Sequence, residues 1–213
     1  MINTELIIVV VATLAVSIWN MLLLLKDWET KGTKIKMYCA VMIVIQMITI
    51  LFAKKFYPQM SVCTCIRQMG LMALIWQAAA HDYKKEIIPN KIILEGILFR
   101  AIMLVLEFLF ERDIFLSTII SDIVALIGIT VVMFLCLLVM KNSIGMGDVK
   151  LLMIMAVTQG VTDICMAVFC SMIVAFFAAV YVLITRKKGR KDSLPFAPFL
   201  LIGTIVAFVM TGA

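Results

Sequence analysis

Long apolar stretches separated by short polar breaks follow one another along the chain. The first stretch runs from Leu6 to Leu25 without a charged residue, and similar stretches recur to the end of the sequence. About 20 apolar residues cross the hydrocarbon core of a bilayer as a helix. The pattern therefore predicts an all-α protein, a polytopic transmembrane helical bundle of about eight segments, within a range of seven to nine. The expected segments are 6–25, 37–53, a third that ends near residue 80, 92–110, 114–140, 149–159, 164–185 and 199–210.

The sixth of these segments is short. As a helix, residues 149–159 extend only about 16 Å, roughly half of the hydrocarbon core. A segment of that length survives at membrane depth only inside a bundle or beside a water-filled cavity. The alternative is that the helix boundary lies elsewhere than the hydropathy pattern places it.

The composition supports a membrane protein. Apolar residues make up 64% of the chain and charged residues 15%, and the mean hydropathy is +1.15. An ordinary soluble domain is roughly 45–50% apolar and about 25% charged. A soluble globular protein, a disordered chain and a small disulfide-stapled module are therefore excluded. Continuous apolar runs, rather than alternating ones, also speak against an outer-membrane barrel.

The positive charges are distributed unevenly between the loops. The net charge is +6, and 14 basic residues fall in the loops after the first, third, fifth and seventh segments, against three in the opposite loops. Basic residues collect in cytoplasmic loops, so this excess needs no nucleic-acid partner, and we expect none. The distribution predicts a multi-pass protein of the cell membrane, with these four loops in the cytoplasm and both termini outside.

Two aspartates stand at helix boundaries on the predicted cytoplasmic face. Asp82 follows the third segment in the string HDYKKEIIPNK, and Asp148 begins the sixth in KNSIGMGDVKLL. Two carboxylates that share a pocket cannot easily both ionise. Such a pair suits a protease, because the ionised partner takes a proton from water while the protonated partner donates to the scissile carbonyl. The alternative is an ordinary pair of loop aspartates.

Residues that alter the backbone surround both aspartates. Gly145 and Gly147 lack a Cβ atom, which would let a substrate backbone approach Asp148 closely. Pro89 and Asn90 would end the helix that carries the first aspartate and start the next one.

Two charged or titratable neighbours each allow two interpretations. His81 directly precedes Asp82 and would either tune that carboxylate or simply form a polar helix end. Lys150 follows Asp148 by two residues, and its ammonium would either favour the ionised carboxylate or reach the lipid headgroups.

Three motifs, taken together and in this order, resemble those of the type IV prepilin peptidase family. Asp82 with Ile88-Pro89-Asn90 looks like that family's D…(I/L)P(N/D) motif. GMGDVKLL at 145–152 matches its GxGDxKL signature, and LPFAPFL at 194–200 is similar to the PFxPxL stretch before its last helix. The resemblance covers about residues 66–212.

The resemblance implies a membrane aspartic protease of the GxGD kind, with Asp82 and Asp148 as its catalytic pair. It implies no metal and no other cofactor for proteolysis. The implied substrates are prepilins or pseudopilins of pilus or secretion systems. Their short basic leaders are cut at the cytoplasmic face before an apolar helix, so the bilayer and this helix are the expected partners.

The N-terminal part departs from the larger family members. These carry an insert with two CxxC pairs, thought to bind zinc, and they also methylate the new N-terminus, whereas the loop 26–36 of this chain has no cysteine. The chain therefore resembles a short form with peptidase activity only. We divide it into a protease core, 66–213, and an N-terminal transmembrane region of two helices, 1–65, to which we assign no role.

For the remaining polar and sulfur-bearing residues, a structural role in packing is favoured over a catalytic one. None of the six cysteines forms a CxxC pair, and we expect small buried apolar residues, with a redox role for Cys63 and Cys65 as the alternative. Arg100 and Asp122 fall within consecutive apolar segments, and charges at membrane depth are usually paired. An ion pair between them is expected.

A different class of protein shares some of these features. Buried acidic residues beside a broken helix are also typical of a small proton-coupled transporter. Many transporters repeat such elements in two halves, and the chain holds no second copy of GMGD or of the IPN string. A non-catalytic membrane scaffold is a third alternative, but it would not explain why two aspartates stand in loops that contain glycine and proline.

Overall fold

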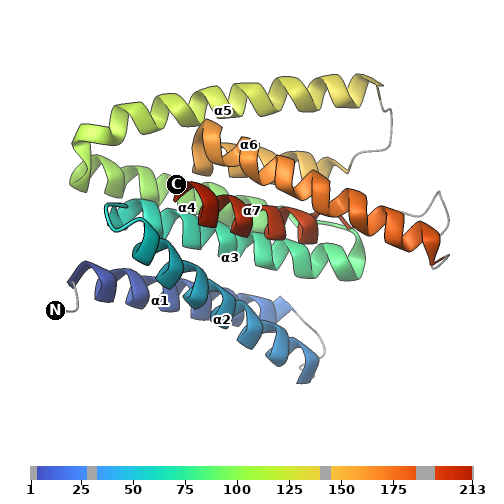
Figure 1. The fold of residues 1–213 in the computed structure, drawn as a ribbon, viewed down its shortest axis with the longest axis horizontal. Coiled ribbons are helices and arrows are strands. Elements are labelled where there is room, and N and C mark those ends of the chain that lie inside the picture. Colours follow the sequence, from blue (N-terminus) through green and yellow to red (C-terminus); the bar gives the residue numbers. More distant parts are fainter. Residues whose placement is uncertain (1–3, 28–32, 140–144, 186–194, 213) are drawn as a thin grey trace.

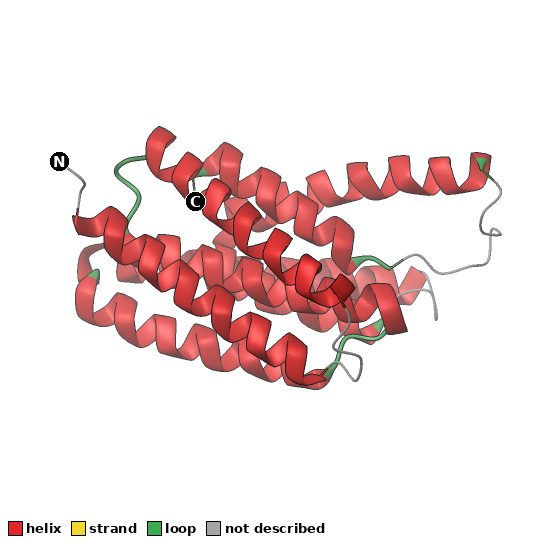
Figure 2. Cartoon of the chain, turned by 90° about the horizontal axis from the view of Figure 1, so that it is seen from below, coloured by secondary structure: helices red, strands yellow, loops and turns green. Residues whose placement is uncertain are grey.

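The computed structural model describes residues 4–27, 33–139, 145–185 and 195–212, and these residues form helices and connecting turns without any strand (Figures 1 and 2). An all-α fold is thus confirmed for the described part of the chain. The helices are α1 (Thr4–Asp27), α2 (Thr33–Phe56), α3 (Val62–Lys85), α4 (Asn90–Phe110), α5 (Arg112–Val139), α6 (Met146–Ile184) and α7 (Ala197–Thr211).

Helix α3 lies at the centre of the bundle. It contacts α1, α2, α4, α6 and α7, with α1 and α2 on one side and α5 and α6 on the other (Figure 1). Its side chains are buried almost continuously from Cys63 to Asp82. The first predicted aspartate therefore stands on the most enclosed helix of the molecule.

Among the described residues, four helices are long and apolar enough to cross a membrane. They cover Thr4–Lys26, Ile35–Phe56, Arg112–Val139 and Met146–Ile184, and α7 is a shorter apolar helix. Helix α5 illustrates the environment, since only Asp122 and Ala125 of its 28 residues are buried inside the protein. Apolar side chains exposed in such numbers have to face lipid.

The described residues form seven helices, one fewer than the eight segments expected. The difference lies in α6, which contains both the sixth expected segment, 149–159, and the seventh, 164–185. Only the last residue of the seventh segment, Thr185, lies outside the helix, as its C-cap. The two parts meet at Gly160, whose φ of 74° and ψ of −176° interrupt the helical backbone. Hydropathy predicted a loop between two helices, whereas the break is made by a single residue.

The two parts of α6 run in opposite directions (Figure 1). At its start, Asp148 interacts electrostatically with Asp82 at the end of α3. Just after the break, Asp163 accepts a hydrogen bond of 3.1 Å from Gln68 near the start of α3. The short first part thus crosses the bundle along α3, and the second part returns while it packs on α7.

Side chains of neighbouring helices satisfy the backbone at this break. In a continuous helix the amide of Val161 would donate to the carbonyl of Val157. Here the Val161 amide donates to Ser121 Oγ at 3.1 Å, and the Val157 carbonyl accepts from Arg100 Nε at 2.7 Å. The short segment is therefore possible at membrane depth because the bundle replaces the lost hydrogen bond.

Arg100 also belongs to a buried charge network. It forms ion pairs with Asp122 and, at 2.8 Å, with Glu107, whose carboxylate also lies 3.3 Å from Arg67. The expected Arg100–Asp122 pair is confirmed. Two guanidinium groups and two carboxylates compensate one another, which is how charges are tolerated inside a membrane bundle.

Candidate active site

Asp82 lies in the last turns of α3, where its side chain meets the beginning of α7. The residue is only 6% exposed. Its Oδ2 accepts a hydrogen bond of 2.9 Å from the backbone amide of Ala197, and the amide of Phe196 also donates to the carboxylate. Burial raises the pKa of the Asp82 carboxyl, and these two amides oppose that rise because they stabilise the ionised form.

The start of α7 explains why these amides are available. The first amides of any helix lack partners within the helix. The N-cap residue Phe196 offers no side-chain acceptor, and Pro198 in the first turn has no N–H at all. Asp82 therefore acts as the cap of α7, and the positive end of that helix faces its carboxylate.

Asp148 is the third residue of α6 and half-buried. It is close enough to Asp82 for the two carboxylates to interact electrostatically. The two aspartates that the sequence singled out thus lie within electrostatic reach of each other. Like charges in one partly buried site disfavour double ionisation, so such a pair holds a proton more readily than either carboxylate alone.

The two glycines before Asp148 give room to their neighbours. A Cβ atom on Gly145 would lie 3.1 Å from Asp148 Oδ2, and one on Gly147 would lie 3.1 Å from Cβ of Ile88. Gly145 therefore lets the carboxylate fold back towards the start of α6. Gly147 lets α6 pack on the segment that follows Asp82. Access of a substrate backbone, the role expected from the sequence, stays a prediction.

The segment between α3 and α4 joins the two halves of the site. Helix α4 begins at Asn90 with Pro89 as its N-cap, as the sequence predicted, whereas α3 already ends at Lys85, where Glu86 caps it in the left-handed conformation (φ 52°). The exposed Lys150 donates a hydrogen bond of 3.0 Å to Asn90 Oδ1. This contact ties the first turns of α6 to the segment after Asp82, a role that sequence reasoning did not foresee.

Three other residues that the sequence singled out also lie on α3. His81 is buried beside Asp82 on α3, and its influence on the carboxylate stays a prediction. Cys63 and Cys65 are buried free thiols, far along α3 from Asp82. Within the described residues, no three Cys, His, Asp or Glu side chains gather into a group that could hold a metal.

Sequence reasoning missed the amides of Phe196 and Ala197. The two prolines around them mark a helix start, which was visible in the sequence. The sequence could not show that these amides donate to Asp82, because that contact depends on how α7 packs against α3. A backbone N–H is also common to all residues except proline, so no residue type marks it as a donor.

Comparison with known proteins adds one match. Residues 69–183, just over half of the chain, match the type IV leader peptidase family. The matched range includes both aspartates but ends before α7 and excludes α1 and α2. No curated protein and no solved structure matches the chain.

Proposed function

Because the chain belongs to the type IV leader peptidase family and is therefore a peptidase, we propose that it cleaves the basic leaders of type IV prepilins or pseudopilins as a membrane aspartic endopeptidase. The observation that carries this proposal is the electrostatic interaction between Asp82 on α3 and Asp148 on α6, both at least partly buried. A shared proton between two carboxylates is what peptide hydrolysis by an aspartic pair requires.

Each aspartate has a defined part in the proposed reaction. Asp82, held by two amides of α7, is the ionised partner and takes a proton from a water molecule. The water oxygen attacks the scissile carbonyl carbon while protonated Asp148 donates to the carbonyl oxygen. When the C–N bond of the tetrahedral gem-diol breaks, Asp82 gives its proton to the leaving nitrogen and Asp148 takes a proton back from a gem-diol hydroxyl. The amine and the new carboxyl group are released, and both side chains return to their starting states.

The distribution of charge supports cleavage at the cytoplasmic face. The loops after the first and third predicted segments each contain several lysines, and the second of these loops follows Asp82 directly. A basic leader that stays in the cytoplasm would place the scissile bond at this level of the membrane. The apolar helix that follows it would lie among the lipid-facing helices.

The transporter alternative receives less support. Four of the charged residues deep in the bundle, Arg67, Arg100, Glu107 and Asp122, form ion pairs with one another, which is a structural arrangement. The buried Asp163 accepts a hydrogen bond from Gln68. Membership in a peptidase family also favours hydrolysis over transport.

The proposal is tested with a reporter that has a short lysine-rich leader followed by an apolar helix of about 20 residues. Purified full-length protein in detergent micelles should cut the reporter once, directly before the apolar helix, as read by mass spectrometry of the product. A reporter whose leader carries glutamates instead of lysines is the matched control. Absence of cleavage, or cleavage inside the apolar helix, would contradict the proposed function.

A further inference from the structure

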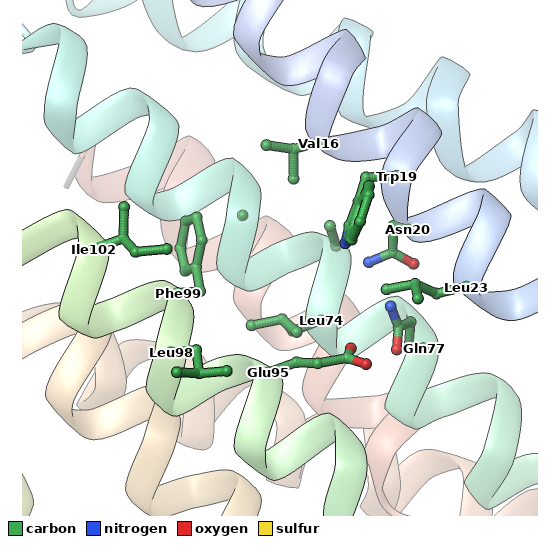
Figure 3. A pocket seen from close by; sticks show the side chains of 12 residues that line it. Val16, Trp19, Asn20, Leu23, Leu74, Gln77, Glu95, Leu98, Phe99 and Ile102 are labelled. Atoms are coloured by element: carbon green, nitrogen blue, oxygen red, sulfur yellow. The ribbon is translucent and has the colours of Figure 1, made fainter.

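A groove of about 360 Å³ lies between α1, α3 and α4 (Figure 3). Most of its wall is apolar, and three polar side chains, Asn20, Gln77 and Glu95, converge at one end (Figure 3). The groove therefore has a polar end and an apolar body. The apolar body is lined by Val16, Leu74, Leu98, Phe99 and Ile102.

The polar end is the one nearer to the two aspartates. Gln77 precedes Asp82 on α3 by five residues, which is about 7.5 Å along the helix axis. Glu95 follows Asn90 on α4 by five residues, and Asn90 is hydrogen-bonded to Lys150 at the start of α6. Ile102, at the other end, lies about 10 Å further along α4. The apolar body therefore leads away from the site into the bundle.

The polar end carries the acceptor oxygens of Asn20, Gln77 and Glu95 beside the amide donors of Asn20 and Gln77. Asn20 is only 3% exposed, and its Oδ1 has no hydrogen-bond partner. Glu95 brings a carboxylate to the same end of the groove, next to Gln77 (Figure 3). A buried acceptor without a partner is costly, so the groove favours a ligand that brings N–H donors or positive charge to this depth.

The beginning of a helix has these properties. Its first four amides lack partners within the helix, and its N-terminus carries a partial positive charge. Inside a bilayer no water is present to satisfy those amides. The carboxylate of Glu95 and the amide oxygen of Asn20 are complementary to such an end, and the apolar wall beyond them is complementary to the side chains that follow.

We propose that this groove binds the first turns of the substrate's apolar helix, on the carboxyl side of the scissile bond; this inference rests on the proposed leader peptidase function. Helical geometry places Gln77 and Asp82 about 140° apart around α3. The substrate chain would therefore pass around the end of α3 in an extended form, and about four extended residues reach about 13 Å. Its helix then begins at the polar end and runs along the apolar body.

Two adjacent residues of α4 provide a matched test. Leu98 lines the groove and Ile97 does not, and the two are 56% and 55% exposed. Leu98→Trp should fill part of the groove and raise KM for the lysine-leader reporter about tenfold while kcat stays within about twofold. Ile97→Trp, which adds the same ring on a face turned away by about 100°, should leave KM within about twofold.

Photo-crosslinking locates the occupant independently. With benzoylphenylalanine at position 98 in full-length Asp148→Asn protein, crosslinks should form to the reporter's apolar helix, at the fifth residue after the scissile bond or later. The same group at position 97 should react mainly with lipid. Crosslinks of equal yield from both positions, or only lipid adducts at position 98, would overturn the groove assignment.

The outcomes separate the two proposals. Failure of the wild-type protein to cut the reporter would overturn the function and, with it, the groove assignment. Normal cleavage by the wild-type protein together with an unchanged KM for Leu98→Trp would overturn only the groove assignment.

Discussion

At the scale of single residues, the carboxylate of Asp82 accepts its hydrogen bond from a residue 115 positions later in the chain, at the start of α7. The two donors there are backbone amides, so their contribution does not depend on the side chains of Phe196 and Ala197. A hydrogen bond to a charged group contributes roughly 1.5–3 kcal/mol. Loss of one donor should therefore change the protonation of Asp82 measurably.

Ala197→Pro removes this N–H at the first helical position, where proline is common, with a cost in stability because the preceding Phe196 has αR dihedrals that a following proline disfavours. Without the donor the ionised form of Asp82 is less stable, so the pKa of its carboxyl rises. If ionised Asp82 is the base, the acid limb of the pH–kcat/KM profile for the reporter should move upwards by about one pH unit. Ala197→Ser, which retains the amide, should leave the limb in place, and an unshifted limb in Ala197→Pro would contradict the assigned role.

The aspartates themselves were predictable from the sequence because charges are scarce in this chain. Asp82 and Asp148 stand beside prolines and glycines at the ends of apolar runs, where a polar side chain is conspicuous. The contact between Lys150 and Asn90 was not predictable, since it joins two exposed residues whose helices approach only in the folded bundle. The sequence motifs thus indicated the two carboxylates proposed to react. The contacts that hold the surrounding segments in place depend on how the helices pack.

At the scale of elements, α6 shows the limit of hydropathy. Polar residues such as Gln159 and Asp163 marked an interruption at 160–163, but Gly160 is only one of 10 glycines in the chain, so the pattern did not show that this single residue reverses the helix. What makes the break possible lies elsewhere, in Ser121 of α5 and Arg100 of α4. A pattern confined to one segment cannot report partners that other helices supply.

Gly160→Ala tests the role of this break. Its φ of 74° is unfavourable for a residue with a Cβ atom, and that atom would lie 2.7 Å from Ser121 Oγ. Strain of this kind costs about 1–3 kcal/mol. The variant should unfold several degrees lower in a thermal scan in detergent.

The control is Gly128→Ala in α5, where an added Cβ meets nothing within 4 Å. In a helix interior this change is neutral or stabilising by up to about 1 kcal/mol. Equal unfolding temperatures of the two variants would show that Gly160 is not under the constraint described.

At the scale of the whole molecule, the site depends on helices from both ends of the chain. Asp82 and Asp148 lie within the range shared with the leader peptidase family, whereas α7, which holds Asp82, lies beyond it. Helix α1 also lies outside that range and contributes Asn20 and Val16 to the groove. The N-terminal region, to which the sequence assigned no role, forms one wall of the proposed substrate groove.

The most direct measurement of the central claim is reporter cleavage by Asp82→Asn, Asp148→Asn and the double variant. Residues that act as one catalytic unit are strongly non-additive. Each single variant should therefore lower kcat by at least about a thousandfold, and the double variant should be no slower than the singles. Asp113→Asn, an exposed residue at the start of α5, is the matched control and should retain full activity. Cleavage at the wild-type rate by either single variant would contradict the aspartic pair.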